Sequence, residues 1–324
     1  MTGSQRGIAL LLVLWILSIL MVIAMSFTFM TRSDAYSALY FREGVQKKYL
    51  AEAGIERGIM ELIHRSVNKN QVVKLEGMEI AKTDGRAYYG KLENGSYRFR
   101  LEDESGKMNI NALSDASGIL LKNLLLNSGV PQGEADIIVD SILDWKDADD
   151  LHRLNGAESD YYLSLPNPYR AKDANFDTLE ELLLVRGVTP EILYGGGETK
   201  GIIRSLTLRP DSSFTINVNV APREVLMAIP GMTDSIADVV IANRETDDPA
   251  ALQKSMEDIR IGLGQSYALV SQFLGTGDSN TFAIEATGFM ESEKTGYPIR
   301  TVVNFEGNNQ YRYIYYKSPA DRRQ

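Results

Sequence analysis

The chain has few of the residues from which catalytic and cofactor sites are usually built. Its 324 residues include no cysteine, which excludes disulfides, thiol nucleophiles and cysteine metal ligands. It has only two histidines, His64 and His152, and no HExxH, GxSxG or Walker A pattern. The run Gly195–Gly201 has the residue types of a phosphate loop without their order. The sequence therefore predicts a protein that is not an enzyme.

The chain also lacks an excess of positive charge. It carries 34 Lys and Arg residues against 43 Asp and Glu residues, a net charge of −9. Proteins that bind nucleic acid through its phosphates need the opposite balance, so this composition argues against a general phosphate-binding surface. It suits a domain outside the cytoplasm or a cation site. With 44% hydrophobic residues, the chain can form a buried core and two or more modules.

No charged residue occurs between Ile8 and Met30. This apolar run is long enough to cross a membrane as a helix, which takes about 20 residues. A secretory signal would have small residues before a cleavage site after the run, and none follows Met30. The short leader ends instead in Arg6-Gly7, before the run. We therefore expect the apolar segment to remain on the mature protein as a membrane anchor.

Apolar residues at three- and four-residue spacing continue from Ser33 to about His64, without a proline. We therefore expect one long helix over 8–65, with 8–30 in the membrane. Alternating patterns predict strands at both ends of the remaining chain: Tyr97–Leu101, Lys107–Asn111, Thr281–Thr287, Pro298–Phe305 and Tyr311–Tyr316. The pattern between Leu113 and Gly275 is mainly helical.

Strands at both ends and helices between them indicate an α+β fold, in which a large all-α domain is inserted into an antiparallel sheet. Two serial domains are the alternative, but two or three early strands alone form a poor sheet. An internal repeat supports duplicated helix-hairpin-helix or SAM-like units, because Leu182–Ile192 aligns with Leu226–Ile236. Asn109-Ile-Asn111 is echoed by Asn217-Val-Asn219.

The sharpest polar cluster starts at the end of a predicted helix and contains five candidate metal ligands: Asp144, Asp147, Asp149, Asp150 and Glu158. Ca²⁺ binds six to eight oxygen atoms, which closely spaced carboxylates can supply. Counted from Asp147, the spacing matches an EF-hand loop in part, with Glu158 at position twelve but His152 where the loop needs Gly. The alternative is a solvated acidic loop in which Asp149 or Asp150 caps a helix.

The segment Leu226–Arg244 resembles a helix-hairpin-helix of DNA-binding proteins. Such hairpins use G-x-G to bring backbone N–H groups to a phosphate, and here Met232-Thr233 follows Gly231 without a second glycine. Asp234 and Asp238 flank the turn where a DNA-binding hairpin would carry Lys or Arg. We therefore expect this unit to pack against protein rather than to bind DNA.

The order of basic residue, Gly and retained apolar helix resembles the leader of type IV pilins and pseudopilins. In that family a prepilin peptidase cuts after the Gly and methylates the new N-terminus, which implies processing between Gly7 and Ile8. Most members carry a Glu at the fifth mature residue, where this chain has Leu12. A buried charge there is costly without a partner. Absence of this Glu is typical of the minor pseudopilin K of type II secretion.

Further motifs resemble the minor pseudopilin K family along nearly the whole chain: Asp103–Leu113, Ile142–Asp149, Gly156–Glu158, Phe176–Gly187 and Ile216–Pro222. The resemblance implies a pilin-like helix packed on an antiparallel sheet, Ca²⁺ binding, and a place at the tip of a pseudopilus. It implies minor pseudopilins I and J as partners, prepilin peptidase as the processing enzyme, and the secretin or secreted cargo as further contacts. Its place would be the bacterial inner membrane, crossed once, with the C-terminal domain in the periplasm.

These observations predict the following division: a leader at 1–7, the N-terminal helix at 8–65, a head from 66–112 and 276–318, an inserted helical domain at 113–275, and a tail at 319–324. Two alternatives to the pseudopilin remain at this point. One is a membrane-anchored helix-hairpin-helix protein for DNA binding or uptake, which would need a basic face. The other is a minor pilin of a type IV pilus.

Overall fold

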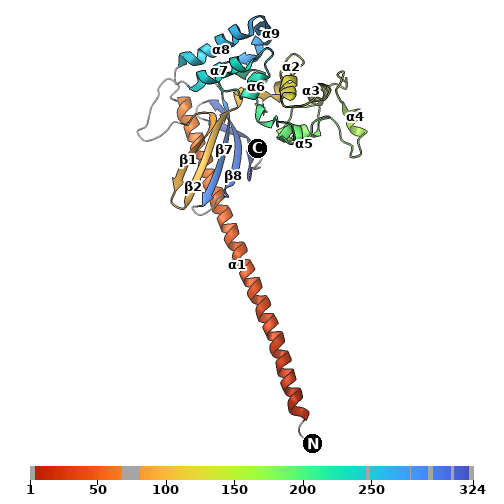
Figure 1. Cartoon of the computed structure of the whole chain (residues 1–324), viewed down its shortest axis with the longest axis vertical. Coiled ribbons are helices and arrows are strands. Elements are labelled where there is room, and N and C mark those ends of the chain that lie inside the picture. Colours follow the sequence, from red (N-terminus) through yellow and green to blue (C-terminus); the bar gives the residue numbers. More distant parts are fainter. Residues whose placement is uncertain are drawn as a thin grey trace.

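One helix makes up the N-terminal fifth of the molecule. The structure is a computed structural model, which describes residues 4–67, 81–245, 249–277, 279–290, 295–307 and 310–320. Helix α1 (Ser4–Val67) runs without a break over 64 residues, about 96 Å at 1.5 Å per residue. Figure 1 shows its N-terminal half extending away from the rest of the chain. The single long helix expected from the apolar spacing is confirmed.

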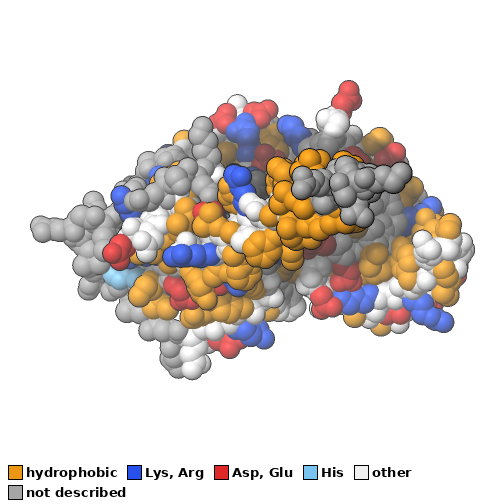
Figure 2. All heavy atoms as spheres, turned by 90° about the horizontal axis from the view of Figure 1, so that it is seen from below, with side chains coloured by type: hydrophobic (Ala, Val, Ile, Leu, Met, Phe, Trp, Pro, Cys, Tyr) orange, Lys and Arg blue, Asp and Glu red, His pale blue; other side chains and the backbone are white. Residues whose placement is uncertain are grey.

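The two halves of α1 meet different surroundings. Side chains from Leu10 to Phe41 are largely exposed, and the most apolar window of the helix has a mean hydropathy of 2.8. Figure 2, a view from below, shows hydrophobic side chains covering this projecting part. From Leu50 onward one face is buried, through Ala51, Ile55 and Ile59. The helix therefore has a first half with the length and composition of a single membrane span, and it continues into the core of the head.

The head is a five-stranded antiparallel sheet in the order β1-β2-β7-β8-β9. Its strands are β1 (Asp84–Leu92), β2 (Gly95–Asp103), β7 (Thr281–Met290), β8 (Tyr297–Gly307) and β9 (Gln310–Lys317). Strand β2 pairs with β7 in the register Leu101↔Ile284, although 177 residues separate β2 from β7 in the sequence (104–280). The early and late strands therefore form one sheet, and the predicted fold class is confirmed.

Helix α1 lies on this sheet and closes its core. Ile55 and Ile59 of α1 pack with Leu101, Ile284 and other sheet residues. Gly54 allows the close approach, because a Cβ there would lie 2.9 Å from the Cβ of Ala286. Strand β1 was not predicted. It is an edge strand with only Tyr88 buried, so it has no alternation of apolar and polar residues to detect.

The segment between β2 and β7 forms two helical units, which sit at the end of the sheet away from the anchor (Figure 1). The first helical unit (residues 108–207) contains β3 (Met108–Asn109), η2 (Ile110–Ala112), α2 (Gly118–Asn127), α3 (Gln132–Lys146), α4 (Ser159–Leu163), η3 (Leu179–Leu184), α5 (Pro190–Tyr194), η4 (Ile203–Ser205) and β4 (Leu206–Thr207). A short turn, η1 (Glu104–Gly106), leads into it from β2.

The second helical unit (residues 216–275) repeats this plan with fewer elements. It contains β5 (Ile216–Asn217), α6 (Arg223–Met227), α7 (Asp234–Glu245), α8 (Pro249–Leu263), η5 (Gly264–Ser266), α9 (Tyr267–Val270), η6 (Ser271–Phe273) and β6 (Leu274–Gly275). Each unit is closed at its base by a two-residue parallel pairing, β3 with β4 and β5 with β6. The expected strand Lys107–Asn111 is thus only the short β3, because η2 follows it at once.

The two aligned sequence segments also have similar local structure. Gly187 and Gly231 both have positive φ, and Thr189 and Thr233 accept hydrogen bonds from the N–H groups of Ile192 and Ile236. The order of elements along the chain, however, gives a different correspondence between the two units than the sequence alignment does. Counted from β3 and β5, the hairpin α2–α3 corresponds to α6–α7, and Gly129 corresponds to Gly231. The similarity found in the sequence is therefore a shared turn, and the larger repeat begins at Asn109 and Asn217.

Candidate metal centre

An acidic loop (residues 147–158) leaves the first helical unit where α3 ends. Asp147 caps the end of α3, with its N–H donating to the carbonyl of Leu143. The loop returns to the unit at Glu158, directly before α4. In the second helical unit only residues 246–248 lie between α7 and α8. The acidic loop is therefore an addition that belongs to one of the two units.

Three of the five predicted ligands lie together in the structure. Asp147, Asp149 and Glu158 each place a carboxylate oxygen within 4.8 Å of those of the other two. Glu158 is only 1% exposed, and neither of its carboxylate oxygens has a hydrogen-bond partner. One oxygen of Asp147, Oδ1, is likewise buried without a partner. Buried polar atoms normally have a hydrogen-bond partner or a ligand, so these three residues are the ones that could hold a cation.

The negative charges of these carboxylates repel one another. Burial, together with the charges of Asp144 and Asp147, raises the pKa of Glu158 from 4.5 to about 7. A carboxylate surrounded by others holds its proton because ionisation would add a further negative charge. A divalent cation would remove this penalty. Carboxylate oxygens are the donors that Ca²⁺ prefers, and each of the three groups could offer at least one.

The other two predicted ligands have different environments. Asp144 is fully buried on α3, and its Oδ1 accepts a hydrogen bond of 2.7 Å from Arg153 Nη1. Burial raises the pKa of Asp144, while Arg153 acts in the opposite direction. Asp150 is exposed and lies outside the three-carboxylate group. The structure therefore brings Asp147, Asp149 and Glu158 together, whereas Asp144 is fully buried and bound to Arg153.

Arg153 is the functional residue that the sequence pattern did not identify. Its Nη1 also contacts Asp147 Oδ2 at 2.6 Å, and its Nε contacts Asp115 Oδ1 at 2.8 Å. It thereby occupies one oxygen of Asp147 and leaves the other for a ligand. Gly156 belongs to the same arrangement, because a Cβ there would lie 1.8 Å from Asp144 Oδ2. A single basic residue within an acidic run was the available signal.

The hairpin that resembles a DNA-binding unit has an acidic turn. Arg223 forms ion pairs with Asp234, at 2.6 Å, and with Asp238, both in α7. A phosphate at the start of α7 would meet these two carboxylates, which are largely exposed. The geometry therefore gives no support to nucleic-acid binding by this hairpin.

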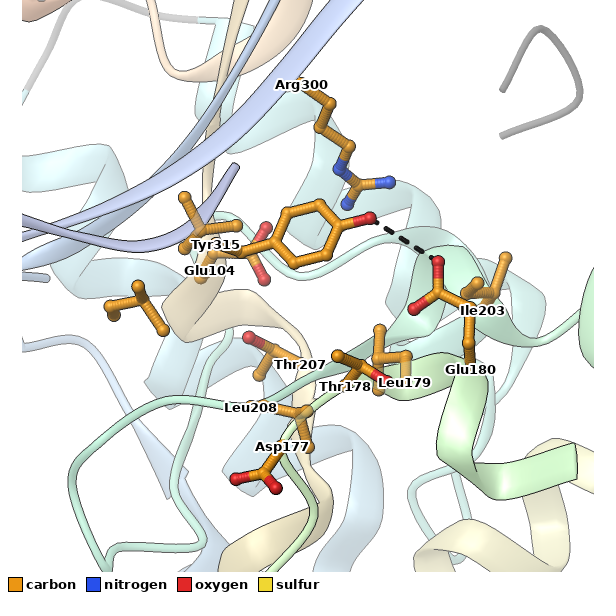
Figure 3. A pocket seen from close by; sticks show the side chains of 12 residues that line it. Glu104, Asp177, Thr178, Leu179, Glu180, Ile203, Thr207, Leu208, Arg300 and Tyr315 are labelled. Carbon is orange, nitrogen blue, oxygen red and sulfur yellow. Dashed lines mark hydrogen bonds between the residues drawn. The ribbon is translucent and has the colours of Figure 1, made fainter. Parts of the chain in front are cut away.

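A small cavity of about 50 Å³ lies where the first helical unit meets the sheet (Figure 3). On its rim, Tyr315 of β9 donates a hydrogen bond of 3.4 Å to Glu180 of η3. Beside it, buried Lys107 contacts Glu102 at 2.8 Å and Glu104 at 2.7 Å. Lys107 lowers the pKa of Glu102 to about 2. Glu180 also pairs with Lys317 of β9 at 3.3 Å, so the contacts of Glu180 join the unit to the sheet.

The predicted processing site lies in the first turns of α1. Gly7 and Ile8 belong to the helix, and Leu12 follows one turn later with a side chain 55% exposed. Nothing in this geometry tests cleavage, which stays a prediction.

Comparisons with known proteins agree with this architecture. Residues 106–194 match the family model described as type II secretion system (T2SS), protein K. The chain is 25% identical over 260 residues to the putative type II secretion system protein K of Escherichia coli K12, covering 75% of this chain and 76% of that protein. It is 26% identical over 270 residues to protein K of Pectobacterium carotovorum subsp. carotovorum, covering 78% and 79%.

A solved structure shows the same fold. The chain matches one in the crystal structure of the GspK-GspI-GspJ complex from the enterotoxigenic Escherichia coli type 2 secretion system, with a TM-score of 0.64 and 15% identity. The match covers 89% of this chain and all of that one. Together with the sequence relatives, it confirms the predicted resemblance to the K proteins of type II secretion.

Proposed function

Because this chain is related to the K proteins of type II secretion over about three quarters of its length, we propose that it is a minor pseudopilin at the tip of the pseudopilus. In this role it is a structural, non-enzymatic component of protein export. The chain is anchored in the inner membrane by the first half of α1, and its sheet and helical units stand in the periplasm.

The position of the two helical units is the main support for placing this protein at the end of the filament. They lie at the end of the sheet opposite the anchor (Figure 1). In a filament built from parallel α1 helices, the next head would stack on that end, where the two units leave no room. Leu12 agrees with a place at the tip. A tip subunit has no neighbour above it whose N-terminal ammonium would need a carboxylate at this position.

The proposed partners are minor pseudopilins I and J, as in the complex that contains the structural relative. The full chain, extracted from membranes in detergent, should co-purify with both in a defined complex and should not form filaments with itself. Gold-labelled antibody against the helical units should mark pseudopili at one end. Labels that repeat along the shafts would contradict the terminal place while leaving the fold intact.

We also propose cleavage by prepilin peptidase between Gly7 and Ile8, followed by methylation of Ile8. The support is the Arg6-Gly7 leader before an unbroken apolar helix that has no small-residue cleavage pattern after it. Intact mass of the membrane-extracted protein should correspond to a chain that begins at a methylated Ile8. A chain that retains Met1, or one that begins after Met30, would exclude this processing.

Finally, we propose that the acidic loop holds Ca²⁺ through Asp147, Asp149 and Glu158. The support is the set of buried carboxylate oxygens without partners, which suits a hard cation. The ion would neutralise the carboxylates and tie both ends of the acidic loop together. Isothermal titration calorimetry should detect Ca²⁺ binding that Asp149→Ala removes. No binding heat in the wild-type chain would leave only a solvated loop, and unchanged heats in Asp149→Ala would exclude Asp149 as a ligand.

A further inference from the structure

The acidic loop carries two hydrophobic side chains that point outward. Leu154 is 97% exposed, more than any other large hydrophobic side chain among the described residues, and Leu151 is 76% exposed. We call this pair the leucine prong. The same unit buries an extensive apolar core, so these two leucines are left outside although a core lies close by. Two exposed leucines on one short loop form a small apolar tip.

The leucine prong is held rigidly from below. Arg153 turns inward between the two leucines and contacts Asp115, Asp144 and Asp147 at 2.8, 2.7 and 2.6 Å. Asn155 donates two hydrogen bonds of 3.0 Å to Asp140, one from its backbone and one from its side chain. A contact that is already ordered loses little conformational entropy when a partner binds. The loop is therefore built to present the leucines.

The surroundings of the prong are acidic. Asp150 and Asp160 are exposed close to it in the sequence, and Asp160 is paired with His152 at 3.0 Å. Such a rim repels anionic lipid headgroups and phosphates. The anchor also keeps the prong away from the inner membrane, since α1 rises about 30 Å from Met30 to Leu50, its first buried residue. A lipid surface is therefore a poor partner.

We infer that the leucine prong docks into an apolar pocket with a rim of Lys or Arg side chains on a partner protein. Burying two leucine side chains favours association, because their apolar surface leaves water. Complementary rim charges add orientation and speed of association more than affinity. The docking is thus a weak, directed contact, and it goes beyond the proposed place at the filament tip.

Photo-crosslinking in cells tests this inference. The full chain would carry p-benzoylphenylalanine at position 154 and, as a control, at position 261, where Ile261 of the second helical unit is 66% exposed. We expect a discrete protein adduct from position 154 and none of the same mass from position 261. Mass spectrometry of the adduct should place the crosslink in an apolar pocket bordered by Lys or Arg.

A charge reversal tests the rim. Asp150→Lys should lower the yield of the adduct about threefold or more, because it replaces an attraction by a repulsion. The matched control is Glu198→Lys, which reverses an exposed acid in another loop of the same unit. An adduct with lipid, a crosslink in a surface without basic residues, no adduct above the control, or equal loss in both variants would overturn the inference.

Discussion

The two helical units share a scaffold but differ in what they carry. In each unit, an asparagine on the first short strand donates a hydrogen bond to a backbone carbonyl that follows the last short strand. Asn109 donates to Asp211, and Asn217 donates to Gly277, both at 2.9 Å. A basic residue near the end of the second helix then closes the turn after the first strand. Lys146 donates to the carbonyls of Ile110 and Leu113, and Arg244 to those of Val218 and Ala221.

The difference begins where α3 and α7 end. The first unit inserts the acidic loop and α4, and the returning chain gives Asn111 two hydrogen bonds with the backbone of Phe176. The second unit has no such segment, and Oδ1 of Asn219, the counterpart of Asn111, is buried without a partner among the described residues. A duplicated scaffold can thus keep its supporting contacts while one copy gains an additional loop.

The largest expected effect tests the shared scaffold. Lys146→Met and Arg244→Met should each lower the free energy of unfolding by about 3–5 kcal/mol, because buried carbonyls lose charged donors. Urea unfolding monitored by circular dichroism would measure both. As a control, Arg260→Met removes an exposed surface pair with Glu257 and should leave the free energy of unfolding almost unchanged. A large loss in only one of the two units would break the equivalence.

The pH dependence of stability should reveal the acidic loop. The folded-state pKa of Glu158, about 7, exceeds its ordinary 4.5, so the folded protein holds a proton that the unfolded chain releases. Without metal, stability should therefore fall as pH rises from 4.5 to 7, by up to about 3 kcal/mol. Glu158→Gln should flatten this fall in chelator. If stability fell equally steeply with pH in that variant, the pH dependence would have to come from other titratable groups.

Added Ca²⁺ should act only through the first unit. Binding to the folded state at a hundredfold excess over Kd adds about 2.7 kcal/mol. Thermal unfolding with Ca²⁺ and with chelator would measure the gain, which Asp147→Ala should abolish. Asp177→Ala removes an exposed carboxylate elsewhere in the unit, one that pairs with Lys172, and should keep the gain. Equal behaviour of the two variants would contradict the assignment of the ligands.

The smallest effect distinguishes the two asparagines. Asn111→Ala removes two hydrogen bonds to Phe176 and should cost about 2 kcal/mol. Asn219→Ala, at the matching place, removes an oxygen that has no partner and should cost less than about 0.5 kcal/mol by the same reasoning. Urea unfolding of the pair provides the measurement. Equal costs would mean that the hydrogen bonds with Phe176 add nothing to the support of the first unit.

The sequence by itself determined the long-range plan of the molecule. The uncharged run and the unbroken helical spacing predicted α1, and alternation in Tyr97–Leu101 and Thr281–Thr287 predicted strands from both ends of the chain. These patterns survive because burial against lipid or one face of a sheet imposes a period on the residues themselves. Edge strand β1 carries no such period, since most of its side chains are exposed.

Only the tertiary structure decided which members of the acidic run act together. The spacing alone treats Asp144, Asp147, Asp149, Asp150 and Glu158 alike. The fold turns Asp144 and one oxygen of Asp147 toward Arg153, leaves Asp150 in solvent, and buries Glu158 beside Asp147 and Asp149. Such choices depend on chain reversals through Asn155 and Gly156, which place residues by three-dimensional contact rather than by any repeating pattern.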